Sequence, residues 1–225
     1  MVKVCLTIDD GPSSDFLRKV KFLDSMGIPA VFFCRGDFLE RRAKAAILAV
    51  KKGLIIGNHS YDHPHFSELD IDQAIEQILR TDRIMERIYE KAGVERHAKL
   101  FRFPYGDRGS GREVDESWPE LAKPREGRRS RELMKFLKSL GYVEVPWTFE
   151  TLEWSIFKGY HGHSVRDIGG VFSRIDGLFG RSRKEVVLIH DHPETKEFFP
   201  LIIEKFLEHG AEFEPLDQIQ SLVLG

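Results

Sequence analysis

Cysteine is scarce in this sequence, with only two residues, Cys5 and Cys34, among 225. Each lies within an apolar run, where a free thiol behaves as a small buried hydrophobic group. We therefore interpret both as buried free thiols, and a disulfide or a reactive thiol is the less favoured alternative.

An excess of charge of either sign is also missing, because 34 Lys and Arg residues face 36 Asp and Glu residues for a net charge of −2. This balance gives no electrostatic reason to expect nucleic acid as a partner. No apolar run approaches the length needed to cross a membrane. The first residues lack the basic segment, apolar segment and cleavage site of a secretion signal, so the cytoplasm is our default expectation.

The composition that remains is that of a globular protein, with 41% hydrophobic and 31% charged residues. A chain of 225 residues fits one large α/β unit of roughly 200 to 250 residues. We expect a single catalytic domain over residues 1–225. The oligomeric state cannot be predicted from the sequence.

Short apolar runs alternate with helical patterns along the chain, which favours βαβ crossovers and a parallel sheet. The expected helices lie at about 16–26, 39–52, 71–92, 131–140 and 197–209, with a further helix after Ser164. The expected strands are Val2–Ile8, Ala30–Cys34, Leu54–Gly57, Leu100–Phe103, Tyr142–Val145, Val186–His190 and, more weakly, Ala211–Leu216. The predicted fold class is α/β, a distorted, TIM-like (β/α) barrel of about seven parallel strands.

Two polar segments interrupt this alternation. The segment at about 107–130 contains Trp118 and the basic cluster Arg125–Arg131, and is too long for an ordinary connection. We expect a solvated loop there, with the hypothesis that it gates a cleft. The segment Ser155–Arg183 carries Tyr160, His161 and His163 and has an ambiguous helical pattern.

The first strand ends in two adjacent carboxylates, Asp9 and Asp10, followed by Gly11-Pro12. Ionised carboxylates at the edge of a core need a cation, a proton or hydrogen-bond donors. The carboxyl ends of parallel barrel strands all lie on one face, where active sites are built. The partner of these two charges should therefore come from the ends of other strands.

His59 and His63 are four residues apart after the third strand, close enough to bind one cation. Pro64 disfavours a helical conformation at His63, so we expect a turn at the strand end. Two histidines with one carboxylate leave an open position for water, which is typical of a catalytic rather than a structural zinc site. Histidines that cap a loop or hydrogen-bond within the core are the alternative interpretation.

Three further stretches follow strands on the same face: FRFPYG, WTFETLEW and LIHDHPE. Taken together, the sequence resembles the polysaccharide deacetylase family (carbohydrate esterase family four, with its chitooligosaccharide deacetylase homology domain). Four motifs match closely, and the fifth has Glu150 and Glu153 where the family has aspartates. The matching segments are 7–12, 59–63, 102–105 and 188–190.

The resemblance implies a role for each matching residue. Asp9 would be the general base and His190 the general acid, with Arg102 holding Asp9 ionised and Glu153 orienting His190. One divalent metal ion would bind Asp10, His59 and His63, with zinc as the first choice and cobalt or another divalent ion as alternatives. Trp154 and Leu188 would shape the acyl pocket, and the backbone amide of Tyr105 would complete the oxyanion site.

The resemblance further implies a metal-dependent hydrolase that removes N-acetyl groups from a carbohydrate such as a chitooligosaccharide or peptidoglycan. One alternative keeps the site but acts on a small amide, such as a formyl amide, a ureide or an acylated amine. Another is a glycan-binding relative without catalysis. The remaining histidines of interest match no family position and are expected to be loop histidines: His65, His161, His163 and His192.

Overall fold

A computed structural model describes residues 2–113, 123–158, 165–179 and 183–216. The chain forms two compact units. Unit one comprises Met1–Phe32, Lys52–Leu54 and Trp147–Gly225, and unit two comprises Phe33–Lys51 and Ile55–Pro146. Residues 118, 160, 161 and 163, for which the sequence suggested loop roles, lie outside the described residues.

The strands of unit one are built around β1 (Val2–Gly11), whose residues are almost all buried. Their order is β2-β1-β9-β8, and β10 also pairs with β1. The parallel register of β1 and β9 runs from Val2↔Arg183 to Asp9↔His190. The partner strands are β2 (Ala30–Cys34), β8 (Phe149–Glu150), β9 (Arg183–His190) and β10 (Glu212–Phe213).

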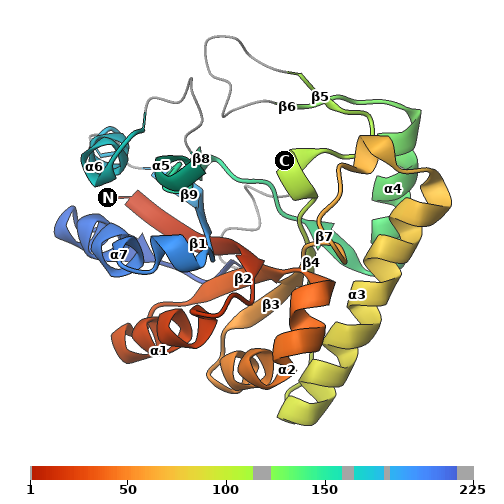
Figure 1. Ribbon diagram of the computed structural model, residues 1–225, viewed down its shortest axis with the longest axis horizontal. Helices are drawn as coiled ribbons and strands as arrows, with labels where there is room; N and C mark the ends of the chain where they lie inside the picture. The colour runs from red at the N-terminus through yellow and green to blue at the C-terminus, as the bar shows by residue number, and fades with distance from the viewer. Residues whose placement is uncertain (1, 114–122, 159–164, 180–182, 217–225) are drawn as a thin grey trace. The chain divides into compact units, whose positions relative to one another are not determined.

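The helices of unit one cover this sheet with apolar faces. In α1 (Phe16–Met26) the side chains of Phe16, Val20 and Leu23 are buried, and Gly27 ends the helix at φ +65°, a conformation that glycine adopts without steric cost. Helices α1 and α7 lie side by side (Figure 1), and the ring centroids of Phe22 and Phe199 are 6.1 Å apart. The other helices are α5 (Ser155–Lys158), α6 (Ile168–Asp176), α7 (Phe198–Glu208) and the 3-10 helix Pro193–Thr195.

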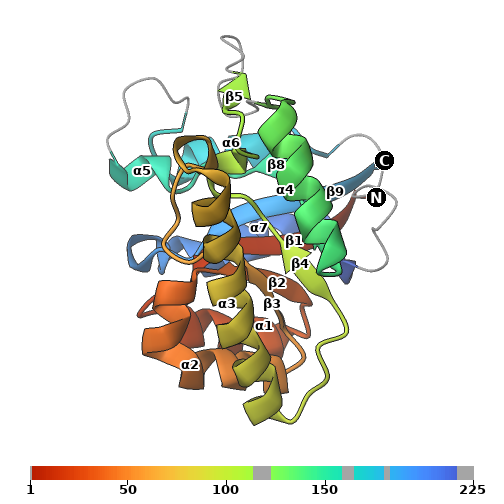
Figure 2. The same cartoon turned by 90° about the vertical axis from the view of Figure 1, so that its right-hand side faces the viewer.

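Unit two has the strand order β7-β4-β3-β2, and β2 serves both units because the boundary follows Phe32. Its longest helix, α3, begins with Asp70 and Gln73 in a reciprocal capping box and ends before Gly93. Helix α3 lies beside α2 and α4 (Figures 1 and 2). The elements are β3 (Ile55–Asn58), β4 (Lys99–Phe101), β7 (Tyr142–Glu144), α2 (Gly36–Lys51), α3 (Ile71–Ala92), α4 (Arg128–Ser139) and the 3-10 helices Phe66–Glu68 and Pro104–Gly106.

The predicted fold class is confirmed, since the strands belong to a parallel α/β sheet of the distorted-barrel type. One element differs from expectation: WTFETLEW contains the short strand β8, which pairs in parallel with β9. Two residues are too few to show the alternation that reveals a strand. Whether the chain is a single domain stays a prediction.

The polar segment at 107–130 contains two short strands that the sequence did not predict. Arg112–Glu113 (β5) and Lys123–Pro124 (β6) pair as antiparallel strands. The next helix begins at Arg128, so the end of the basic cluster is helical, and Arg128 forms an exposed ion pair with Glu132 one turn later. The gating hypothesis stays a prediction. Among the described helices, none combines the length and apolarity that crossing a bilayer would require.

Candidate active site

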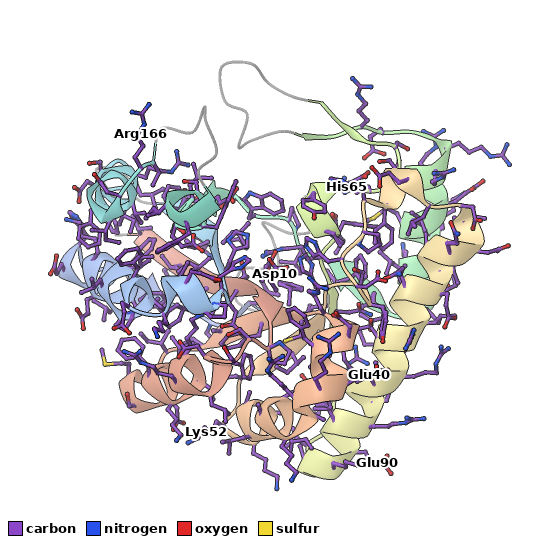
Figure 3. The ribbon with its side chains drawn as sticks, in the orientation of Figure 1. Asp10, Glu40, Lys52, His65, Glu90 and Arg166 are labelled. Carbon is purple, nitrogen blue, oxygen red and sulfur yellow. The ribbon has the colours of Figure 1, made fainter. Side chains whose placement is uncertain are left out.

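The adjacent carboxylates of Asp9 and Asp10 lie at the carboxyl end of β1 in unit one. Asp9 is 3% exposed and is the register partner of His190 on β9. Asp10, which is labelled in Figure 3, has a left-handed backbone at φ +66°. Since successive side chains of an extended strand point to opposite faces, this turn at Asp10 changes where the second carboxylate is directed.

A buried ion pair joins α1 to Asp191, the residue that follows β9. Lys19 Nζ lies 2.6 Å from Asp191 Oδ1, and both side chains are almost fully buried. The backbone N–H and the hydroxyl of Ser13 donate to the same carboxylate at 2.7 and 2.9 Å. Burial raises the pKa of Asp191, while Lys19 and Ser13 act against that shift. The backbone N–H of Asp191 also donates to Asp9 O at 2.8 Å.

The pairing of Lys19 with Asp191 was not predicted from the sequence. Lys19 was an available signal, because it lies on the same helical face as Phe16, Val20 and Leu23, all of which are buried. A lysine on an apolar face needs a buried acceptor.

His190 and Glu153 form the second charged pair of unit one. His190 Nδ1 lies 3.1 Å from Glu153 Oε1, and the His190 backbone N–H donates to the same oxygen at 2.6 Å. Thr151 donates its hydroxyl to the other carboxylate oxygen. Burial disfavours the imidazolium, but the Glu153 carboxylate overcomes this effect and raises the pKa of His190 to about 9. Glu153, which is longer than the aspartate of the family motif, therefore reaches His190 and can orient its ring.

Trp154 lies beside this histidine, with the two rings edge-on and their centroids 6.2 Å apart. Its indole N–H donates to Glu150 Oε1 at 2.7 Å, which fixes the plane of the ring. Leu188, the other residue expected to shape an acyl pocket, is 2% exposed and lies in the core of β9.

Unit two brings His59 and His63 together. Their Nε2 atoms are 3.2 Å apart. His59 Nδ1 lies 2.8 Å from the carbonyl oxygen of Arg102. Because a carbonyl only accepts, Nδ1 bears the hydrogen and Nε2 is the lone-pair nitrogen. That tautomer is the one in which His59 can bind a metal ion through Nε2.

The backbone between the two histidines forms the turn that Pro64 predicted. Ser60 and His63 have φ values of +63° and +66°. Asn58 holds the turn in place: its side-chain oxygen accepts from Ser60 N at 3.0 Å, and its amide donates to Tyr142 Oη at 3.1 Å. Arg96 in turn donates to Tyr142 Oη at 2.7 Å. A buried polar network therefore fixes the turn that carries the two imidazoles.

Arg102 and Tyr105 follow β4 in the same unit. Arg102 is 1% exposed, and its Nε donates to the carbonyl of Val145 at 2.8 Å. Its guanidinium lies 4.3 Å from the centre of the Phe33 ring. Tyr105 lies in a tight turn at φ +57°, and its ring centroid is 4.6 Å from that of His63.

Two histidines that were expected to be loop histidines contact predicted site residues: His65 contacts Tyr105, and His192 contacts Asp10. His65 stacks on Tyr105 with the ring centroids 3.9 Å apart and an interplanar angle of 11°. His192 Nε2 lies 3.2 Å from Asp10 Oδ2 in unit one. The resemblance offered no position for either residue, so only the structure could reveal these contacts.

Comparison with known proteins decides the family. The model of the family described as polysaccharide deacetylase matches residues 2–116. The chain belongs to the polysaccharide deacetylase family. The sequence-based assignment to carbohydrate esterase family four is thereby confirmed.

Relatives in this family are moderately similar to the chain. A peptidoglycan-N-acetylglucosamine deacetylase from Bacillus cereus is 28% identical over 155 residues, which is 68% of this chain and 46% of that protein. The structure of the peptidoglycan deacetylase PdaC from Bacillus subtilis has a TM-score of 0.69 at 24% identity, covering 97% of this chain and 90% of that one.

A family pseudoenzyme from Bacillus anthracis has the same fold, with a TM-score of 0.67 at 21% identity over 93% of this chain and 62% of that one. The part of the chain that matches the Bacillus cereus deacetylase spans less than half of the length of that relative.

Proposed function

We propose that the protein is a metal-dependent hydrolase that removes N-acetyl groups from an N-acetylated carbohydrate. The Bacillus cereus relative is named as a peptidoglycan-N-acetylglucosamine deacetylase. We propose that this chain also acts on an N-acetylated sugar. The observation that carries the proposal is the pair of histidine Nε2 atoms, 3.2 Å apart on a fixed turn.

The donor chemistry of these residues fits a divalent cation. Two nitrogens that are each 2.0–2.1 Å from a tetrahedral zinc ion lie about 3.3 Å apart, close to the separation of His59 Nε2 and His63 Nε2. Asp10 is the third ligand that we propose, because zinc binds carboxylate oxygens as well as histidine nitrogens. In this position a divalent cation supplies Lewis acidity, which polarises the amide carbonyl and acidifies water.

The chain's own residues divide the proton transfers between them. Asp9 accepts a proton from the water that attacks the amide carbonyl, and Arg102 is the residue proposed to orient Asp9. His190, held by Glu153, donates a proton to the leaving nitrogen as the C–N bond breaks. The products are acetate and a free amino sugar.

The oxyanion that develops on the carbonyl needs a hydrogen-bond donor. The backbone amide of Tyr105 is the proposed donor, and the turn at φ +57° fixes its direction. Trp154 and Leu188 are the proposed walls of the acyl pocket.

A binding protein without catalysis is the second candidate, and the Bacillus anthracis pseudoenzyme shows that this fold occurs without activity. The contact of Glu153 with His190 argues for catalysis, because a binder has no need for an oriented, charged histidine.

The experiment that separates the candidates measures acetate release from N-acetylglucosamine oligomers and from small formyl and acetyl amides by zinc-loaded protein. Release from the oligomers supports the proposal, and His59→Ala should abolish it. Release from the small amides alone would favour a small-molecule amidohydrolase. Binding of the oligomers without release from any substrate would favour the binding protein.

A further inference from the structure

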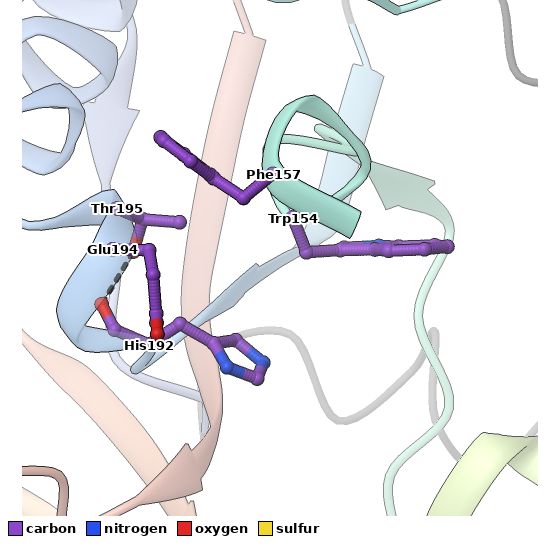
Figure 4. Close-up of a pocket in the computed structure, with 5 residues that line it drawn as sticks. All are labelled: Trp154, Phe157, His192, Glu194 and Thr195. Atoms are coloured by element: carbon purple, nitrogen blue, oxygen red, sulfur yellow. Dashed lines mark hydrogen bonds between the residues drawn. The ribbon is translucent and has the colours of Figure 1, made fainter. Parts of the chain in front are cut away.

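Unit one contains a pocket of about 150 Å³ lined by Trp154, Phe157, His192, Glu194 and Thr195 (Figure 4). The residues come from the start of α5 and from the turn after β9. No role is assigned by the family motifs to Phe157, Glu194 or Thr195.

The pocket adjoins the groups that the proposed reaction uses. His192 contacts the carboxylate of Asp10 at 3.2 Å. Trp154 lies edge-on to His190, with the ring centroids 6.2 Å apart. A group bound in the pocket therefore lies next to the general acid and to a proposed metal ligand.

The aromatic walls are held in place before any ligand binds. Phe157 stacks on Phe198, with the centroids 5.4 Å apart and an interplanar angle of 28°. The Trp154 indole is fixed by its hydrogen bond to Glu150. Preorganised rings lose little entropy on binding, and the apolar C–H face of a sugar can pack against them.

The size and polarity of the pocket suit one sugar ring. Its volume is below the roughly 300 to 1,000 Å³ of pockets that enclose drug-sized ligands, so a single ring is the natural occupant. The hydroxyl of Thr195 already donates to the carbonyl of His192 at 2.8 Å (Figure 4). Glu194 supplies the charged acceptor at the rim, where it can accept hydrogen bonds from sugar hydroxyls.

The charge of Glu194 also discriminates between sugars. A carboxylate accepts hydrogen bonds but donates none, so it repels a second carboxylate brought close to it. Among the described residues that line the pocket, neither Lys nor Arg is present to neutralise such a pair. A sugar with a carboxylate substituent is therefore disfavoured.

We propose that this pocket holds the ring of the sugar whose N-acetyl group is removed, and that Glu194 there selects uncharged N-acetylated sugars over sugars that carry a carboxylate. The inference rests on the proposed function, since it concerns the substrate of the same site. N-acetylglucosamine is a sugar of the favoured class. N-acetylmuramic acid, which bears a lactyl carboxylate, is one of the disfavoured class.

The test uses the zinc-loaded protein and a tetrasaccharide in which the two sugars alternate, and mass spectrometry locates each lost acetyl group. Wild-type protein should deacetylate N-acetylglucosamine preferentially. Glu194→Gln should raise the share lost from N-acetylmuramic acid about five- to tenfold, the order expected for two partly shielded like charges about 5 Å apart. Glu208→Gln removes an exposed carboxylate on α7 and should leave the ratio unchanged.

A second variant tests the stacking wall. Phe157→Ala should raise KM for N-acetylglucosamine oligomers several-fold with little change in kcat, because it removes binding made before the chemical step. Phe157→Tyr should restore KM.

An unchanged sugar ratio in Glu194→Gln, or an unchanged KM in Phe157→Ala, would overturn the subsite while deacetylation itself stands. Failure of the proposed function looks different, because no His59-dependent acetate would then be released from any N-acetylated sugar.

Discussion

Asp9 and His190 are register partners at the carboxyl ends of the neighbouring parallel strands β1 and β9. The proposed base and the proposed acid are thus separated by one strand spacing and are held by sheet hydrogen bonds rather than by loops. Residues mounted on strands keep their geometry better than residues on loops, which suits a reaction that needs two proton transfers at one amide.

The base is tested by Asp9→Asn. An amide cannot accept the proton from water, so kcat should fall about 100- to 10,000-fold, the range for general base catalysis. Metal content, measured by elemental analysis, should stay at the wild-type level because the ligands are unchanged. Loss of metal together with activity would instead place Asp9 among the ligands.

The pair of His190 and Glu153 makes stability depend on pH. Because the pKa of His190 is raised from 6.5 to about 9, its stabilising contribution is complete below about pH 6.5 and is lost as the pH rises through 9. The pKa of Glu153 is lowered, although burial opposes this shift, so Glu153 stays ionised across that window.

Glu153→Gln removes the charge that raises the pKa of His190. In metal-stripped protein, the Tm difference between wild type and Glu153→Gln should be largest near pH 6 and should shrink as the pH rises through about 9. A difference that is constant over this range would show that the two groups are not electrostatically coupled.

The buried pair of Lys19 and Asp191 makes a separate prediction about stability. Removing one partner leaves an uncompensated buried charge, so Lys19→Met should lower the free energy of unfolding by about 3 to 5 kcal/mol. The double variant Lys19→Met, Asp191→Leu should recover much of that loss, as measured by urea unfolding. An effect below about 1 kcal/mol for the single variant, typical of exposed pairs, would contradict the pairing.

The sequence predicted most of the strands and the turns at their ends because short apolar runs are bounded there by Gly, Pro and polar residues. The first helix ended as expected at Gly27 and the third before Gly93. The turn between His59 and His63 also followed from a local cause, the proline after His63.

The sequence could not reveal features that depend on contacts between distant segments. Lys19 and Asp191 are 172 positions apart, and the hydrogen bond from Asn58 to Tyr142 spans 84. The contact between His192 and Asp10 and the pocket beside Trp154 likewise arise only when β1, β9 and α5 are folded. Such pairs leave no periodic signal, because nothing in the local sequence specifies the partner.

The proposed function requires that His59, His63 and Asp10 hold a metal ion on which deacetylation depends. Its most direct test is acetate release from the N-acetylglucosamine tetramer by chelator-stripped protein, before and after stoichiometric zinc is added, beside His59→Ala. Stripped wild-type protein should be inactive and should recover with zinc, whereas His59→Ala should stay inactive at the same zinc concentration. Equal acetate release by stripped and zinc-loaded wild-type protein would show that deacetylation does not depend on a bound metal ion.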